Sequence, residues 1–281
     1  MKTIAVLTDY SKSAEHATQF AFHMAKKMKA KVLLFSVCAI PSAKQLLLAG
    51  EPEQLPEYEH ALVDFGRRMA QDLVACTFPG CYLPEVNVDC DSSEIVDIMT
   101  AIMRNEEICL IVTAPTAEND LATYILSDAC NRIIDWATVP VLVVPETAPL
   151  RYFEKIAFAS QLHEEDIYSI AELGSLLESF AAELMVAHLN SDPSDNGIRT
   201  IEEKLNRDLY KKVDCGGVYF RSITDTDKQK NWDWLKANKR TELLAVVQQP
   251  REQMARFFER GQNEEVTSHL TLPVMILPKR P

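Results

Sequence analysis

The sequence has 281 residues and a net charge of −12. This length fits two domains of about 140 residues better than one domain. Hydrophobic residues make up 47% and charged residues 25%, which is ordinary for a globular protein. The negative charge excludes nucleic acid and anionic membrane surfaces as expected partners, because both would repel an acidic protein.

The sequence also predicts a location. Strand-like sequence begins at Lys2, with no signal-peptide pattern before it. The longest apolar runs have the length of a strand, far below the roughly 20 residues that span a bilayer. The seven cysteines are odd in number and form no CxxC pair, which favours free thiols in a reducing compartment. We therefore expect a cytoplasmic protein.

Strands and helices alternate along the first half of the chain. A continuous apolar run at 3–7 predicts a strand buried on both faces, and Ser11 can cap the helix that follows. Apolar runs and helical periodicity then predict strands at 31–37, 86–88, 108–112 and 141–144, with helices at 57–76, 92–103 and 121–136 between them. Strands separated by helices favour right-handed crossovers and a parallel sheet covered on both faces, so the fold class is α/β.

The second half repeats this order. The expected strands are 155–159, 183–189, 218–221, 243–247 and 274–277, and the expected helices are 164–180, 201–212, 227–238 and 251–269. The segment Thr138 to Pro145 is echoed by Thr271 to Pro278, and both follow a helix and close a series. Pro145 and Pro149 interrupt structure between two apolar strands. We therefore divide the chain into residues 1–147 and 148–281, called here the first and the second half.

Both halves resemble domains of the universal stress protein family. The segment from Lys2 to Ser11 is similar to the opening strand and Thr-Asp-Phe-Ser turn of that family, and Pro140 to Val144 is similar to its closing strand. The resemblance implies two tandem doubly wound, Rossmann-like domains, each with a five-stranded parallel sheet of order 3-2-1-4-5. It also implies that residues 141–144 and 274–277 lie side by side at an internal pseudo-twofold axis, as in a pseudo-dimer. Such pairing would cover two apolar edge strands.

Many members of that family bind ATP at the carboxyl ends of strands one and four, the usual crevice of a doubly wound sheet. The resemblance implies an adenosine pocket at Thr8, Asp9 and Val37. It implies a phosphate loop of the form G-x-x-G-x9-G-[ST] after strand four, where glycines allow close approach to phosphate. In this sequence the glycine positions hold Ala114, Ala117 and Ser127, and the hydroxyl position holds Asp128. Glu118 and Asp120 add negative charge.

These changes predict that triphosphate binding is lost. A carboxylate about 4 Å from a phosphate charge costs roughly 1 kcal/mol in water and about 4 kcal/mol at an effective dielectric constant of 20. Asp9 has a second interpretation, in which it only binds backbone amides at the start of the helix. In the second half the Thr-Asp pair becomes Ser160-Gln161, and no glycine spacing is recognisable after strand four, where Arg251 stands.

The remaining chemistry suggests no catalysis. The six histidines have no metal-ligand spacing, and His188 is interpreted as a hydrogen-bonded residue of the core or of a strand end. No G-x-S-x-G or P-loop motif is present. We expect a non-catalytic stress-response module with degenerate nucleotide sites, no cofactor, no metal, an unidentified protein partner and a homodimer. The alternative is a sensor of AMP, a nucleoside or a small metabolite in the first half.

Overall fold

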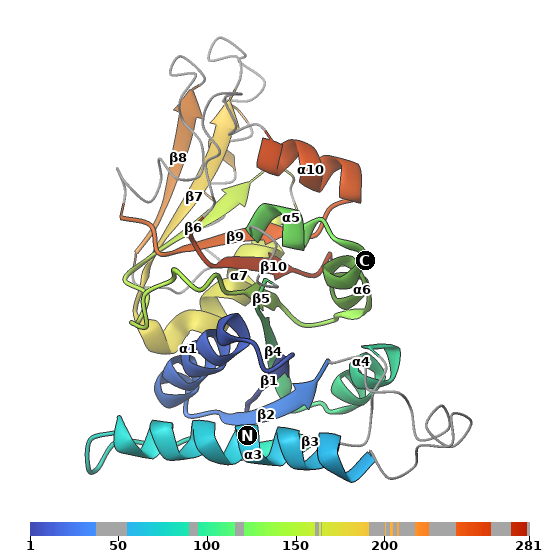
Figure 1. Ribbon diagram of the computed structural model, residues 1–281. Helices are drawn as coiled ribbons and strands as arrows, with labels where there is room; N and C mark the ends of the chain where they lie inside the picture. The colour runs from blue at the N-terminus through green and yellow to red at the C-terminus, as the bar shows by residue number, and fades with distance from the viewer. Residues whose placement is uncertain are drawn as a thin grey trace.

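The computed structural model describes residues 1–37, 55–89, 95–115, 121–160, 163, 165–190, 200, 203, 204, 207, 217–224, 240–259 and 271–279. The ten strands are β1 (Thr3–Thr8), β2 (Lys31–Ser36), β3 (Val86–Asp89), β4 (Ile108–Thr113), β5 (Val141–Val143), β6 (Lys155–Ser160), β7 (Glu183–Asn190), β8 (Val218–Thr224), β9 (Leu243–Val247) and β10 (Val274–Leu277). The described helices are α1 (Lys12–Met28), α3 (Leu55–Ala75), α4 (Ile95–Arg104), α5 (Leu121–Ile125), α6 (Asp128–Trp136), α7 (Asp166–Leu177) and α10 (Arg251–Glu259). Figure 1 shows the first half below the second.

All ten strands belong to one sheet, of order β3-β2-β1-β4-β5-β10-β9-β6-β7-β8. Counted within each half, the order is 3-2-1-4-5, as the resemblance implied. The two halves meet where β5 and β10 pair antiparallel, with Leu142 opposite Met275, and the other pairs are parallel. The expected pairing of the two closing strands is thus present, but the sheet is continuous rather than divided into two separate ones. The antiparallel junction gives each apolar edge strand a hydrogen-bonded partner.

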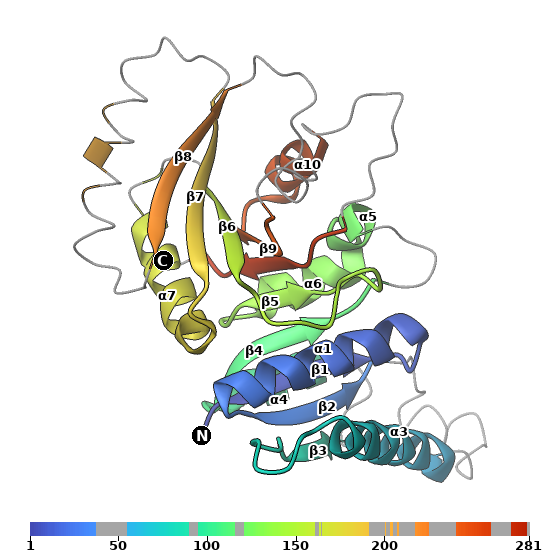
Figure 2. The ribbon, with the colours of Figure 1, turned by 90° about the vertical axis from the view of Figure 1, so that its left-hand side faces the viewer.

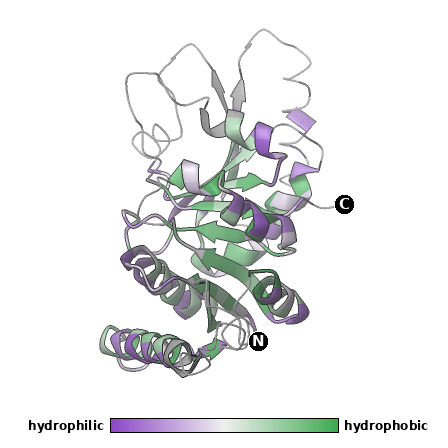
Figure 3. Cartoon of the chain, turned by 45° about the vertical axis from the view of Figure 1, so that its right-hand side comes forward, coloured by the Kyte–Doolittle hydropathy of each residue, from purple (hydrophilic) through white to green (hydrophobic). Residues whose placement is uncertain are grey.

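Helices cover both faces of the sheet, and alternate residues of each strand face opposite layers. In β1, Ile4 and Val6 pack with α1 and α3, whereas Ala5 and Leu7 pack with α4 and α6. Figure 3 shows the strands as mainly hydrophobic and the outer helical surfaces as mainly hydrophilic. The interior of the sheet is therefore buried on both sides, as the continuous apolar runs predicted.

The segment between the halves is part of the core. Phe153 lies with its ring centroid 5.6 Å from that of Phe20 in α1 and 5.5 Å from that of Phe180, in a 3-10 turn (Glu178–Phe180) after α7. Figures 1 and 2 show α7 lying beside α1. The two halves therefore share one continuous core on this face.

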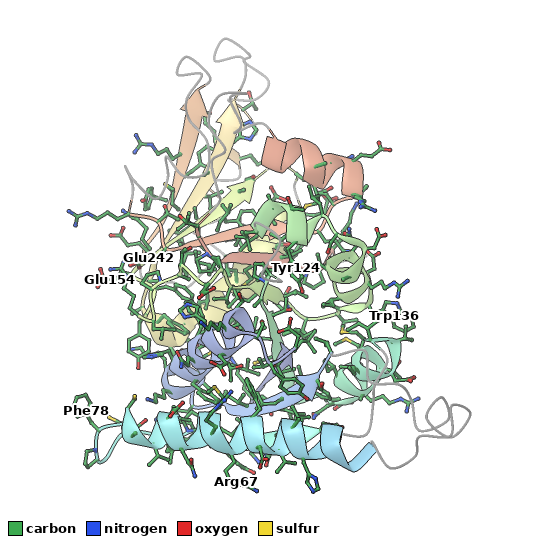
Figure 4. The ribbon with its side chains drawn as sticks, in the orientation of Figure 1. Arg67, Phe78, Tyr124, Trp136, Glu154 and Glu242 are labelled. Atoms are coloured by element: carbon green, nitrogen blue, oxygen red, sulfur yellow. The ribbon has the colours of Figure 1, made fainter. Side chains whose placement is uncertain are left out.

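A carboxylate also holds the segment between the halves. Glu242 Oε2 accepts hydrogen bonds from the backbone N–H of Glu154, at 2.6 Å, and of Lys155, at 3.4 Å. Its Oε1 lies 2.6 Å from Arg151 Nη2. Figure 4 shows Glu154 and Glu242 next to each other. The boundary between residues 147 and 148 stays a prediction.

The structure changes two of the expected helices. The single helix expected at 121–136 is divided into α5 and α6, because the Ser127 hydroxyl accepts from the Cys130 N–H at 3.2 Å and starts a new helix. The helix expected at 164–180 begins at Asp166 and ends in the 3-10 turn. The helix expected at 227–238, the part of the expected last helix at 260–269 and most of the helix expected at 201–212 lie outside the described residues.

No helix in the described ranges combines the length and the apolar character that crossing a membrane requires.

Candidate functional site

The β1–α1 turn carries two of the sequence-predicted site residues. The hydroxyl of Thr8, which is fully buried, accepts from the Tyr10 N–H at 3.0 Å, and Asp9 Oδ1 accepts from the Ser11 N–H at 3.0 Å. Ser11 in turn caps α1 by accepting from the Ala14 N–H at 3.1 Å. Tyr10 has a φ of 64°, in the left-handed region. Asp9 therefore orders the turn, as its second interpretation states, and it is also half-buried beside a cavity.

That cavity has a volume of about 430 Å³ and lies at the carboxyl ends of β1 and β4. It brings together four of the sequence-predicted residues, Asp9, Val37, Ala114 and Asp128. Its other lining residues are Leu7, Ala14, Ile95, Thr113, Tyr124, Ala129, Arg132 and Ile133. The volume falls within the range of small-molecule pockets, and the lining is mostly apolar with a few polar groups.

One wall of this cavity was not predicted from the sequence. The hydroxyl of Tyr124 in α5 lies 2.9 Å from Thr113 Oγ1 at the end of β4, and both residues are buried. Burial raises the pKa of Tyr124 well above its usual value, so the hydroxyl stays protonated. Tyr124 is labelled in Figure 4. The signal that could have found it is a tyrosine in an apolar helix directly after strand four.

The segment that the sequence analysis expects to be a degenerate phosphate loop is only partly within the described residues. Ala114 is half-buried on the cavity wall, whereas Ala117, Glu118 and Asp120 lie outside the described residues. Ser127 is not among the residues that line the cavity. It is the N-cap of α6, and its hydroxyl accepts from the Cys130 N–H. Asp128 follows it in the first turn of that helix.

Asp128 is not an isolated charge. Its side chain is 82% exposed, and its Oδ1 lies 2.6 Å from Nη1 of Arg251, which begins α10 in the second half. The ion pair joins the start of α6 in the first half to the start of α10 in the second. Because both side chains are exposed, it neutralises only part of the negative potential that Asp128 brings to the cavity.

The corresponding corner of the second half is built differently. The Ser160 hydroxyl at the end of β6 donates to Asp166 Oδ2 at 2.5 Å, and both residues are about 5% exposed. His188 Nδ1 lies 3.0 Å from the Ser160 carbonyl oxygen, which supports the interpretation of His188 as a strand-end residue with a hydrogen-bond partner. Gln161 lies outside the described residues.

A search for possible metal centres finds, within the described ranges, no group of three or more His, Cys, Asp or Glu side chains that could hold a metal ion.

Comparison with solved structures supports the fold. A universal stress protein from Archaeoglobus fulgidus is similar with a TM-score of 0.65 and 11% identity over 98% of both chains. A putative universal stress protein from Pseudomonas aeruginosa has a TM-score of 0.56 and 15% identity over 99% of this chain and 93% of its own. The cytoplasmic domain of a prokaryotic cation chloride cotransporter has a TM-score of 0.53 and 10% identity over 98% and 94%. At these identities the likeness shows the fold alone.

Sequence comparison gives the family. No curated protein matches the sequence. The model of the universal stress protein family matches residues 1–145, which is more than half of the chain. The chain therefore belongs to the universal stress protein family.

Proposed function

We propose that this chain is a non-catalytic regulatory module of the stress response, acting in the cytoplasm through contacts with a protein partner or a second copy of itself, and that its nucleotide sites no longer hold a triphosphate. The observation that carries the loss of triphosphate binding is Asp128, an exposed carboxylate on the cavity wall. It stands where the family's loop has a serine or threonine hydroxyl. The hydroxyl of Ser127 is directed to capping α6 instead.

The electrostatic argument sets the size of the effect. An exposed carboxylate near a phosphate costs about 1 kcal/mol, which is roughly a fivefold loss of affinity. The Arg251 side chain at 2.6 Å reduces this cost, but exposed ion pairs are worth little. Arg132 also lines this cavity and offsets a further part of the cost. Each added phosphate group of a nucleotide should therefore bring little or no gain in affinity.

A second candidate function is favoured by the cavity itself. About 430 Å³ of space beside Asp9 and Val37 is enough for a small organic molecule. The apolar walls and the protonated Tyr124 hydroxyl suit a flat, mostly neutral body with a few hydrogen-bonding groups. In this version the first half is a sensor of a nucleoside or of AMP.

One experiment separates the two functions and tests the proposal. The purified chain is titrated with adenosine, AMP and ATP by isothermal calorimetry, in parallel with Asp9→Ala. Heat with adenosine, weaker heat with AMP and none with ATP, all lost in Asp9→Ala, would support the sensor. No heat with any of them would support a regulatory module without a nucleotide ligand. Saturable ATP binding as tight as that of adenosine, or ATP hydrolysis that Asp9→Ala abolishes, would contradict both.

A further inference from the structure

A second, larger cavity lies on the other side of α6. Its volume is about 620 Å³, and it is enclosed by α6, by the corner between β9 and α10, and by Lys279 after β10. Figures 1 and 2 show α6 and α10 on the same side of the sheet, one from each half. The two cavities are neighbours that share Asp128 and Arg132, but Asp9 and Val37 line only the smaller one, and Lys279 and Met254 line only this one.

The acidic groups of this cavity already have hydrogen-bond donors. Asp128 Oδ1 lies 2.6 Å from Arg251 Nη1, and Asp135 Oδ1 accepts from Gln248 Nε2 at 3.1 Å. In both pairs a residue of the first half meets one of the second. The cavity wall therefore presents carboxylates whose charge or lone pairs are partly satisfied by the protein itself.

Two cationic side chains that line the same cavity have no carboxylate partner within the described residues. Arg132 in α6 and Lys279 after β10 are exposed, and neither forms an ion pair with another residue of the described ranges. With Arg251, three cations face two carboxylates, in a chain whose net charge is −12. A local excess of positive charge in an acidic protein attracts an anion only at short range, because the overall field opposes it. Guanidinium and ammonium groups bind carboxylate and phosphate oxygens through charge-assisted hydrogen bonds.

The floor of the cavity is apolar. Ile125, Ile134 and Met254 line it and are 1%, 5% and 6% exposed. A free inorganic anion would gain nothing from these side chains. An organic molecule with an apolar body would bury surface against them, at about 25 cal/mol for each Å² removed from water.

We propose that this cavity binds a small organic anion, with its apolar body on Ile125, Ile134 and Met254 and its carboxylate or phosphate group on Arg132 and Lys279. The site is made of both halves, so it exists only because β5 and β10 pair. It does not depend on the proposed function, because Lys279 and Met254, which hold and report the anion, line only this cavity, although Arg132 lines both. Binding here would strengthen the contact between α6 and α10.

The test uses the methyl resonance of Met254 in the full chain as a local probe. Hexanoate and phenyl phosphate are each titrated and compared with neutral hexanamide. We expect saturable shifts of the Met254 methyl signal with one or both anions, and binding of hexanamide at least tenfold weaker. A tighter hexanoate complex would assign a carboxylate ligand, and a tighter phenyl phosphate complex would assign a phosphate ester.

Substitutions then test the cationic group. Lys279→Ala should weaken binding of the preferred anion about five- to tenfold, and Lys279→Arg should retain it. Lys2→Ala removes an equal charge before β1, three strands away from β10 in the sheet and outside the cavity lining, and should change nothing. Asp9→Ala should abolish adenosine binding, where adenosine binds, and leave the anion titration unchanged. The proposal is overturned by hexanamide binding as tightly as the anions, by Lys279→Ala binding like the parent, or by the absence of any saturable Met254 shift up to 20 mM.

Discussion

At the end of its first strand the first half places Thr8 and Asp9, whereas the second half places Ser160 and, at the start of the next helix, Asp166. In the first half, Asp9 is half-buried, binds the Ser11 N–H and lines a cavity. In the second half, Asp166 is 5% exposed and its Oδ2 is taken by the Ser160 hydroxyl. In the first half this corner of the fold is a turn beside a cavity, whereas in the second half it is a buried, hydrogen-bonded pair of side chains.

The helix starts explain part of this difference. Ser11 caps α1 with its own hydroxyl, so Asp9 is not needed as the cap. Glu165, before α7, makes no capping hydrogen bond, and Asp166 supplies the negative charge in the first turn instead. A carboxylate at a helix N-terminus interacts favourably with the helix dipole. Asp166 therefore stabilises the start of α7, whereas Asp9 lines the cavity of the first half.

The largest expected effect is a difference in stability between the same substitution at the two corners. Asp166→Ala should lower the free energy of unfolding by about 2–3 kcal/mol, because it removes a buried hydrogen bond to a charged group. Asp9→Ala should cost only about 0.5–1 kcal/mol, since Asp9 is half-buried and accepts one part-buried hydrogen bond, from the Ser11 N–H. Urea unfolding followed by circular dichroism measures both. Equal losses of unfolding free energy in Asp166→Ala and Asp9→Ala would show that the buried hydrogen bond of Asp166 adds no more stability than the hydrogen bond of Asp9.

The next effect concerns the polar pair in the cavity wall of the first half. Tyr124→Phe leaves the buried Thr113 hydroxyl without its partner and should cost about 1–2 kcal/mol of stability. Thr113→Val should cost a similar amount, because it leaves the Tyr124 hydroxyl unbonded.

The double variant Tyr124→Phe/Thr113→Val is the control for this pair. Replacing both partners removes both unsatisfied groups, so its loss should be smaller than the sum of the single losses. Strictly additive losses in urea unfolding would mean that the two hydroxyls do not act as a pair.

The contrast between the halves shows what could be predicted from the sequence. Continuous apolar runs such as that of β1 predicted the central strands, because strands buried on both faces need apolar residues at every position. The edge strands β3 and β8 contain polar residues and were predicted from shorter apolar segments in the alternating order of strands and helices. The pairing of β5 with β10 was predicted from the resemblance and the need to cover apolar edges. These features depend on short segments, which can be recognised from a few consecutive residues.

The rest depends on contacts between distant segments. The division of the helix at Ser127 follows from one capping hydroxyl that competes with helical periodicity. The ion pair between Asp128 and Arg251 joins residues 123 positions apart. No pattern along the chain indicates which residue of the other half Arg251 meets. The larger cavity, which joins both halves, was missed for the same reason, whereas the resemblance had placed a pocket at Asp9 and Val37, where the smaller cavity lies.

A smaller effect is expected at Asp128, where the contribution of the phosphate group to binding can be separated from that of the nucleoside. Asp128→Ser restores the hydroxyl of the family's loop and removes a carboxylate from the cavity wall. It should raise the affinity for AMP about fivefold relative to adenosine, which corresponds to about 1 kcal/mol. Parallel calorimetric titrations measure the ratio, and Glu107→Ser, an exposed acid before β4, serves as the control. An unchanged ratio would mean that Asp128 does not face the phosphate.

The smallest expected effect compares the way each half holds a histidine. His188 of the second half has the Ser160 carbonyl oxygen 3.0 Å from its ring, whereas His23 of α1 is packed edge-on against Tyr152, with ring centroids 6.2 Å apart. Burial, together with nearby Lys26, lowers the pKa of His23 below its ordinary value of 6.5. The unfolded chain therefore binds this proton more readily than the folded chain does, so stability falls as the pH drops below about 6.5.

His23→Gln should reduce this acid-dependent loss, because glutamine does not titrate. The measurement is the midpoint of urea unfolding at pH 7.5 and pH 5.5 for the parent, for His23→Gln and for His60→Gln, which replaces an exposed histidine of α3. We expect the parent and His60→Gln to lose more stability than His23→Gln over this interval. The difference should be smaller than the effects above, since the half-buried ring is partly screened by water. If all three proteins lose the same stability, the acid dependence originates elsewhere and the packing of His23 against Tyr152 contributes nothing to it.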